Sequence, residues 1–293
     1  MYPAQFQYYT PKNIGEASEL LRKHSGESKV LAGGMSLIPV LKLRLTRFEH
    51  IVDISGIKGL ADISEEKGHI RIGALATHGE VEASGLIRKK AFLMSETASH
   101  IGDEQVRNMG TIGGGLCHAD PSGDWGSALI AMRGTVQVSS SDGSREIRAD
   151  DFFVDSFTPA LGEDEILSSV TIPVYGERSS GTYAKLERRA GDFAVLGAAV
   201  QLKVDEQDVC KYVGIGLTSL GMTNIRSESA EKALIGKELT PESIADAAES
   251  SRDDMDPLDD AIRGSAEYKK EVGSEYVKRA LLEAMNRLRG GTK

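Results

Sequence analysis

The sequence predicts an α+β protein in which two small α/β units precede a C-terminal domain of sheet and helices. Two glycine-rich motifs, at 33–34 and 110–115, each follow an α/β unit of their own, which is read from strand and helix signals. A polar, glycine-containing stretch at 175–181 then marks a change in composition. Beyond it, strand-like runs precede helical runs, an order typical of an α+β domain.

The first unit, 1–57, begins with a helix and continues through two strands. Asn13 is a residue type that caps helices, and Glu16 is placed to complete a capping box. A helix is therefore expected to start here and to stop near Gly26. The elements expected after it are a strand at 29–32, an apolar segment at 37–45 and a strand at 51–54.

The second unit, 58–175, contains the longest glycine-rich motif of the chain. Its expected elements are strands at 69–75 and 166–174, helices at 78–86, 90–101 and 125–132, and a hairpin that pairs 136–138 with 146–148. Asp142-Gly143 supports the hairpin, because this pair of residues accepts the positive φ of a tight turn. The intervening motif is expected to be a loop.

The C-terminal domain, 176–293, follows the change in composition. Its expected elements are strands at 183–186, 196–204 and 212–220, helices at 228–235, 241–250 and 265–289, and an acidic loop at 252–260. In the last helix, Val272, Tyr276, Ala280 and Ala284 recur at helical spacing and predict one apolar face.

Composition restricts the classes of function. The formal net charge is −9, which disfavours nonspecific nucleic-acid binding, because such binding depends on neutralising phosphates with Lys and Arg. The only two cysteines, Cys117 and Cys210, cannot hold an iron–sulfur cluster by themselves, and they suit a reducing cytoplasm. The N-terminus lacks the order of a signal peptide, and no apolar run is long enough for a membrane span.

Two glycine motifs are candidates for binding an anionic ligand. Gly33-Gly34-Met35-Ser36 allows close backbone approach, and its successive N–H groups could form an anion-holding nest. The stretch 110–115 offers several N–H donors and the Thr111 hydroxyl, and a bulky residue at Gly113 is expected to abolish binding without unfolding the chain. Each motif alone also suits a ligand-free turn. Together they favour a dinucleotide whose diphosphate both motifs hold, although the Rossmann and P-loop patterns are absent.

Several segments, in order, resemble the FAD-binding medium subunits of molybdenum hydroxylases of the carbon monoxide dehydrogenase, xanthine dehydrogenase and aldehyde oxidoreductase type. The stretch 32–39, followed by Lys42-Leu43-Arg44, resembles the first FAD loop, and 105–124 resembles the second. The stretch 188–194 resembles the segment that brings an aromatic or apolar side chain near the flavin. The stretch 263–268 resembles the family's Arg-Gly-Ser segment. The resemblance covers nearly the whole chain.

This resemblance implies two α/β FAD-binding subdomains of the vanillyl-alcohol-oxidase (PCMH) type, plus a C-terminal domain of three-stranded antiparallel sheet with a helical bundle. It implies an oxidoreductase subunit that works in a heterotrimer. A small subunit would carry two [2Fe–2S] clusters and a large subunit molybdopterin. Electrons would pass from molybdenum through the clusters to FAD on this chain, and then to an external acceptor. A cytoplasmic dimer of heterotrimers is expected.

The expected FAD contacts lie in both loops and in the C-terminal domain. The N–H groups of 33–36 and 111–114 would hold the diphosphate. Asp124 could accept a hydrogen bond from a ribose hydroxyl or cap the helix that follows. Lys185 could place its charge near the N1–C2=O end of the flavin or be a surface lysine. Phe193 could lie against the isoalloxazine or in the core. The complete set of cofactor-binding candidates is Ala32, Gly33, Gly34, Met35, Ser36, Leu37, His78, Ile101, Gly110, Thr111, Ile112, Gly113, Gly114, Gly123, Asp124, Leu167, Lys185 and Phe193.

No side chain is assigned a catalytic or metal-binding role, because a flavin supplies the chemistry itself. His78 and His118 are the nearest candidates for proton handling, although a lone histidine is more often structural. His78 could also contact the cofactor through its backbone. Cys117 is expected to be a small packed residue rather than a reactive thiol.

Two other functions fit the same residues. One is a stand-alone flavin oxidase or reductase of the same fold. The other is a non-enzymatic scaffold with a vestigial cofactor site, which Met35 favours because loops of this family often have His, Gln or Asn there. In the family the large subunit selects the substrate. Carbon monoxide, aldehydes, purines and N-heterocycles therefore all stay open, as does the electron acceptor.

Overall fold

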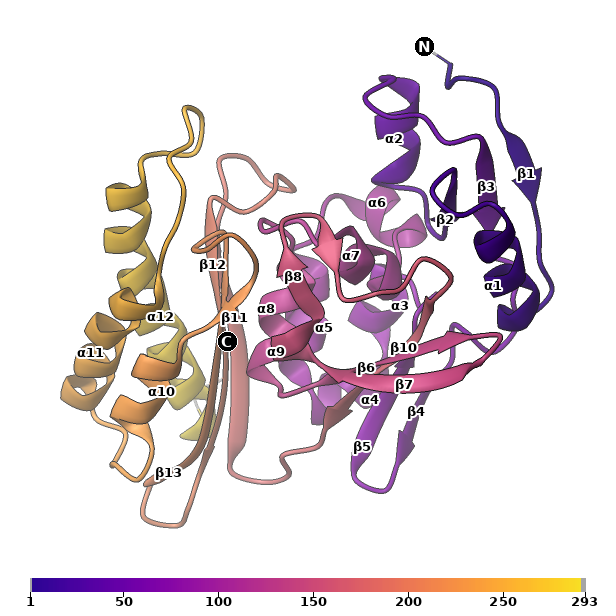
Figure 1. Ribbon diagram of the computed structural model, residues 1–293. Coiled ribbons are helices and arrows are strands. Elements are labelled where there is room, and N and C mark those ends of the chain that lie inside the picture. Colours follow the sequence, from indigo (N-terminus) through magenta and orange to yellow (C-terminus); the bar gives the residue numbers. More distant parts are fainter. Residues whose placement is uncertain (1, 291–293) are drawn as a thin grey trace.

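The computed structural model describes residues 2–290 and shows three sheets with helices packed around them (Figure 1). The sheets follow one another along the chain, from the indigo N-terminal part on the right of the figure to the orange and yellow C-terminal part on the left. A fourth, two-stranded sheet joins β8 (Phe153–Asp155) to β9 (Thr158–Pro159). No helix in the described part of the chain is both long enough and apolar enough to cross a membrane.

The first sheet is parallel and has the strand order β1-β3-β2. Its elements are β1 (Gln7–Tyr9), α1 (Ile14–Lys23), β2 (Ser28–Leu31), α2 (Leu37–Lys42) and β3 (His50–Asp53). The Asn13 side chain caps α1 as expected, but the Glu16 carboxylate reaches the N–H of Lys12 rather than that of the cap. Since the strands are parallel, the loops after all three meet at one edge, where ligands of α/β units usually bind.

The second sheet is antiparallel and has the strand order β4-β5-β10-β6-β7. Its strands are β4 (Ile63–Glu66), β5 (His69–Gly73), β6 (Thr135–Ser140), β7 (Gly143–Arg148) and β10 (Ile166–Pro173). Its helices are α3 (His78–Ala83), α4 (Gly85–Lys90), α5 (Phe92–Ser99), α6 (Glu104–Met109), α7 (Ile112–His118), α8 (Asp124–Ala131) and α9 (Ala149–Phe152). The hairpin of β6 and β7 turns at Gly143, whose φ is 145°.

The second glycine motif is not the loop that the sequence predicts. Thr111 caps α7 through its side chain, and Gly113, Gly114 and Gly115 form the first turn of this helix. Glycine is a poor helix former, so tertiary packing must override its propensity here. A Cβ on Gly113 would lie 2.6 Å from Cβ of Ala74, and one on Gly115 would lie 2.9 Å from the Trp125 ring. Only residues without side chains allow α7 to pack this closely.

The third sheet has four strands rather than the expected three. Its order is β11-β12-β13-β14, and all its pairs are antiparallel. The additional strand, β14, has two residues and lies at the edge, too short to give a sequence signal. The elements of this part are β11 (Ser179–Leu186), β12 (Leu196–Val204), β13 (Cys210–Thr218), β14 (Ile225–Arg226), α10 (Glu228–Leu234), α11 (Pro241–Ser250), the 3-10 helix η1 (Ser251–Asp254) and α12 (Ala266–Leu288). Thus η1 replaces the start of the acidic loop expected at 252–260.

Helix α8 joins the second and third sheets. A Cβ on Gly214 of β13 would lie 1.9 Å from the carbonyl oxygen of Ala131, and one on Gly216 would lie 2.0 Å from that of Ser127. The backbones of α8 and β13 therefore touch, which fixes the first residue of α8, Asp124, against the third sheet. The core of the second sheet accordingly extends to Tyr183 of β11.

Candidate functional site

The two glycine motifs, far apart in the sequence, lie against each other. A Cβ on Gly33 would lie 2.0 Å from the carbonyl oxygen of Met109 and 2.8 Å from Cα of Gly110. A Cβ on Gly114 would lie 3.7 Å from Cβ of Ala32. The loop after β2 and the start of α7 therefore form one continuous backbone surface, as a ligand held by both motifs requires.

The first motif presents a row of free backbone donors. Within residues 2–290, the N–H groups of Gly33, Gly34, Met35 and Ser36 have no hydrogen-bond acceptor. Gly34 has a φ of 75°, the left-handed conformation that turns successive N–H groups to one side in an anion nest. Ser36 caps α2 without a side-chain hydrogen bond, so its hydroxyl is also available. This motif can hold a doubly charged diphosphate.

The second motif offers fewer donors than the sequence suggests. The N–H groups of Ile112 and Gly113 donate to the carbonyl oxygens of Ala76 and Ala74, both at 3.0 Å or less, and that of Gly114 donates to the Thr111 hydroxyl. These three N–H groups thus already have acceptors within the chain. The N–H of Thr111 has no acceptor in the described part of the chain and remains available.

His78 is a buried support beneath the second motif. Its backbone N–H donates to the carbonyl oxygen of Gly110 at 2.9 Å, and the Trp125 indole N–H donates to its Nδ1 at 3.1 Å. Desolvation, with a smaller contribution from the charge of Arg107, lowers the pKa of His78 to about 4. The ring is neutral near pH 7 and accepts at Nδ1, so it does not handle protons there.

A buried polar network begins at Asp124. Its carboxylate accepts a hydrogen bond from the Tyr183 hydroxyl at 2.6 Å and another from Nζ of Lys185 at 3.1 Å. Lys185 also donates to the carbonyl oxygen of His100, and its side chain is 1% exposed. The structural alternative is wrong for each of these residues. Gly123 rather than Asp124 caps α8, and Lys185 is buried rather than a surface lysine.

The loop between β11 and β12 brings Phe193 to the same region. The Phe193 side chain is 48% exposed, so the alternative of a core aromatic is wrong. Gly191, with a φ of 86°, packs against the backbone of Gly102, and Arg107 donates to the carbonyl oxygens of Ile101 and Gly102. The turn at Gly102 thus lies next to the loop that carries Phe193, and the carbonyl oxygen that Lys185 binds belongs to His100, two residues before it.

Comparison with known proteins decides the family. Residues 4–175 match the family model of the FAD binding domain in molybdopterin dehydrogenase, and residues 181–284 match that of the CO dehydrogenase flavoprotein C-terminal domain. The chain belongs to the FAD-binding medium subunits of the molybdenum hydroxylases. Its homologues are dehydrogenase subunits, so it is an oxidoreductase subunit.

Individual relatives match over their full lengths. The medium chain of carbon monoxide dehydrogenase from Hydrogenophaga pseudoflava is 36% identical over 98% of this chain and 99% of the relative. The nicotine 6-hydroxylase medium subunit of Paenarthrobacter nicotinovorans is 35% identical over 95% and 96%, respectively. A solved structure of the Hydrogenophaga carbon monoxide dehydrogenase superposes with a TM-score of 0.95, covering 98% of this chain and 99% of that one.

The remaining candidates of this medium subunit fall into two groups. Ala32, Leu37, Ile101 and Gly123 are partly exposed at the two motifs and at the nearby turn. Leu167 is buried in β10 next to a bulge, where Ala74 donates to the carbonyl oxygen of Ser168. Leu167 therefore supports the strand beneath α7 rather than offering a surface to a ligand.

His118 and Cys117 lie in α7 of the medium subunit but have no evident chemical role. Desolvation is the main cause that lowers the pKa of His118, whose ring packs against Phe157. Burial raises the pKa of the Cys117 thiol to about 12, so the thiolate is not formed near neutral pH. The expectation that Cys117 is a packed, unreactive residue agrees with this environment.

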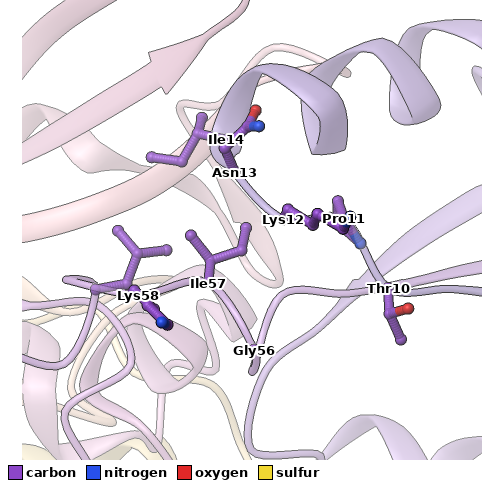
Figure 2. A pocket seen from close by; sticks show the side chains of 9 residues that line it. Thr10, Pro11, Lys12, Asn13, Ile14, Gly56, Ile57 and Lys58 are labelled. Carbon is purple, nitrogen blue, oxygen red and sulfur yellow. The ribbon is translucent and has the colours of Figure 1, made fainter.

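A hollow of about 590 Å³ lies between the segment that leads into α1 and the loop after β3, at the edge where the loops of the first sheet meet (Figure 2). Ile14 and Ile57 line its apolar part, while Lys12 and Lys58 supply charge. None of the expected cofactor residues lines it.

Sequence reasoning did not identify Tyr183, His100 or Trp125 as parts of this site. One signal was readable: Tyr183 and Lys185 alternate on a strand and must share a face. Their common partner, Asp124, lies 59 residues before Tyr183, and only the packing of α8 on the third sheet brings them together.

Proposed function

We propose that this medium subunit binds one FAD and carries electrons from [2Fe–2S] clusters of a small partner subunit to an external acceptor. Substrate would be oxidised at the molybdopterin of a large partner subunit, and two heterotrimers would pair in the cytoplasm. The observation that carries the cofactor part is the row of four N–H groups from Gly33 to Ser36, placed against the second glycine motif. We also propose that the chain divides into 1–57, 58–175 and 176–293.

The residues present fit a flavin dinucleotide. We assign the diphosphate to the first motif and to the N–H of Thr111, and the flavin ring to the region of Lys185 and Phe193. Asp124 acts through Lys185 rather than on a ribose, because both of its oxygens already accept hydrogen bonds within the chain. When bound, FAD accepts electrons and passes them on, and the protein positions it and tunes its potential.

Met35 provides a test of the diphosphate assignment. Its side chain is 36% exposed at the tip of the first motif, so a glutamate there should be tolerated by the fold. Met35→Glu places a negative charge beside the proposed phosphates and should weaken FAD binding at least about tenfold, because like charges at close range repel. Met35→Gln, which adds polarity without charge, should bind as the wild type does.

Binding is measured by titrating the purified chain with FAD and recording absorption and protein fluorescence. Met222→Glu is the matched control, since Met222 is an exposed methionine of the third part of the chain. Equal affinity of Met35→Glu and wild type would overturn the diphosphate assignment.

Purification of a complex that contains molybdenum and iron would support the heterotrimer, whereas full activity of the yellow chain alone would favour the stand-alone oxidase.

A further inference from the structure

Two residues of β11 place their side chains on one face of the third sheet, and Glu187 follows the strand directly. Tyr183 and Lys185 alternate along β11, so they point in the same direction. The first two meet Asp124 at the start of α8, and Glu187 lies beside the Lys185 ammonium, 3.6 Å away. The Tyr183 hydroxyl is thus an uncharged donor within a cluster of three charged side chains, those of Asp124, Lys185 and Glu187.

The position of this hydroxyl is tightly fixed. Gly197 on the adjacent strand leaves room for it, because a Cβ there would lie 2.6 Å from the Tyr183 oxygen. On its other side the hydroxyl lies 3.3 Å from the Thr218 hydroxyl, which donates to Ser127 of α8 at 2.6 Å. Asp124 thus receives one hydrogen bond from Tyr183 and one from Lys185, in a geometry that neighbouring elements enforce.

The hydroxyl matters because the carboxylate is buried. Desolvation raises the pKa of Asp124, and the charge of Lys185 together with hydrogen bonds from Tyr183 and Lys185 opposes this rise. The other titratable groups that face the pair are His100, at the end of α5, and Glu187. Removing a hydrogen bond that favours a charged form raises the pKa of the carboxyl further.

We propose that Tyr183 is a positioning residue for the flavin. By donating to Asp124 it keeps this carboxylate charged and holds the Lys185 ammonium in place, so that Asp124 adds its negative charge to that of Glu187 beside the ammonium near the flavin ring. This inference rests on the proposed FAD site, because Lys185 is the group through which Tyr183 would act.

The test compares Tyr183→Phe with wild type and with Tyr175→Phe, using the full chain loaded with FAD. Tyr175 is a matched control, since its partly buried hydroxyl donates to the carbonyl oxygen of Met132 and not to the network. The midpoint potential of the bound FAD is measured against a reference dye as a function of pH. In Tyr183→Phe the potential should lie above that of wild type in the pH interval where Asp124 is protonated in the variant but still charged in wild type, and the two potentials should converge on either side of this interval.

Gly197→Ala is a second variant that keeps the tyrosine but displaces its hydroxyl, and it should shift the potential in the same direction. Potentials of Tyr183→Phe and Gly197→Ala that coincide with wild type at every pH, with FAD bound, would overturn the role of Tyr183 alone. A wild-type chain that takes up no FAD would overturn the proposed cofactor site together with this inference. An equal shift of the potential in Tyr175→Phe would mean that the loss of any tyrosine hydroxyl changes the potential, and this would also overturn the role of Tyr183.

Discussion

At the scale of single residues, the site depends on buried polar side chains that form hydrogen bonds within the chain. His78 accepts from Trp125 and supports Gly110, and Asp124 accepts from Tyr183 and Lys185. Each of these groups has one charge state that the surrounding structure favours. Their contribution to stability therefore depends on pH, and the direction follows from the shift in each pKa.

His78 gives the clearest case at this scale. Its pKa falls from 6.5 in the unfolded chain to about 4 in the folded protein. The unfolded chain thus binds more protons between these values, so stability falls as pH decreases through this window, by about 3 kcal/mol in total. His78→Gln keeps an acceptor for Trp125 but does not titrate, and should remove this part of the pH dependence. Urea unfolding as a function of pH checks it, and an identical slope in both proteins would contradict it.

At the scale of elements, most of the fold could be predicted, because helix and strand periodicities are local. The parts that could not be predicted are polar strands such as β4, and α7, whose glycines argue against a helix. The candidate site was predictable at the first motif, where Gly33-Gly34 follows a strand. It was not predictable at Tyr183, because the contact with Asp124 depends on how α8 packs on the third sheet.

That packing can be tested at Gly216. A Cβ there would lie 2.0 Å from the carbonyl oxygen of Ser127, so Gly216→Ala must push α8 away from β13. Overpacking of this kind costs about 1–3 kcal/mol, and here it would also displace Asp124. Thermal unfolding should show the loss, and FAD binding should weaken. Gly85→Ala is the control, since nothing lies within 4 Å of a Cβ at that position. Equal stability of the two variants would refute the close contact between α8 and β13.

At the scale of the whole molecule, ion pairs connect the C-terminal part to the second sheet. Arg133, at the end of α8, pairs with Glu231 of α10 at 2.6 Å. Arg287, near the end of α12, binds Glu96 of α5 at 2.7 Å and also donates to the carbonyl oxygen of Gly181 at the start of β11. Because Tyr183 donates its N–H to the same Glu96 carboxylate, the strand that carries Lys185 is held at both α5 and α12.

The Glu96–Arg287 pair should therefore make the unfolding of the whole chain sensitive to acid. Burial alone would raise the pKa of Glu96, but hydrogen bonds from Arg287 and from the N–H of Tyr183 outweigh it and lower the pKa. A carboxyl group whose pKa is lowered by folding stabilises the fold at pH values above the pKa of glutamate in the unfolded chain. This contribution disappears as the pH falls through the lowered pKa of the folded protein. Glu96→Gln should cost about 1.5–3 kcal/mol at neutral pH, since it removes charge-assisted hydrogen bonds and leaves the Arg287 guanidinium with Glu283 as its charge partner, and the difference from wild type should shrink in acid. Calorimetry at several pH values measures both effects, with Glu275→Gln as the control, because the Glu275–Arg279 pair is exposed and should contribute little. A constant difference between Glu96→Gln and wild type at every pH would mean that packing around Glu96, rather than its charge, joins the C-terminal domain to the flavin-binding part.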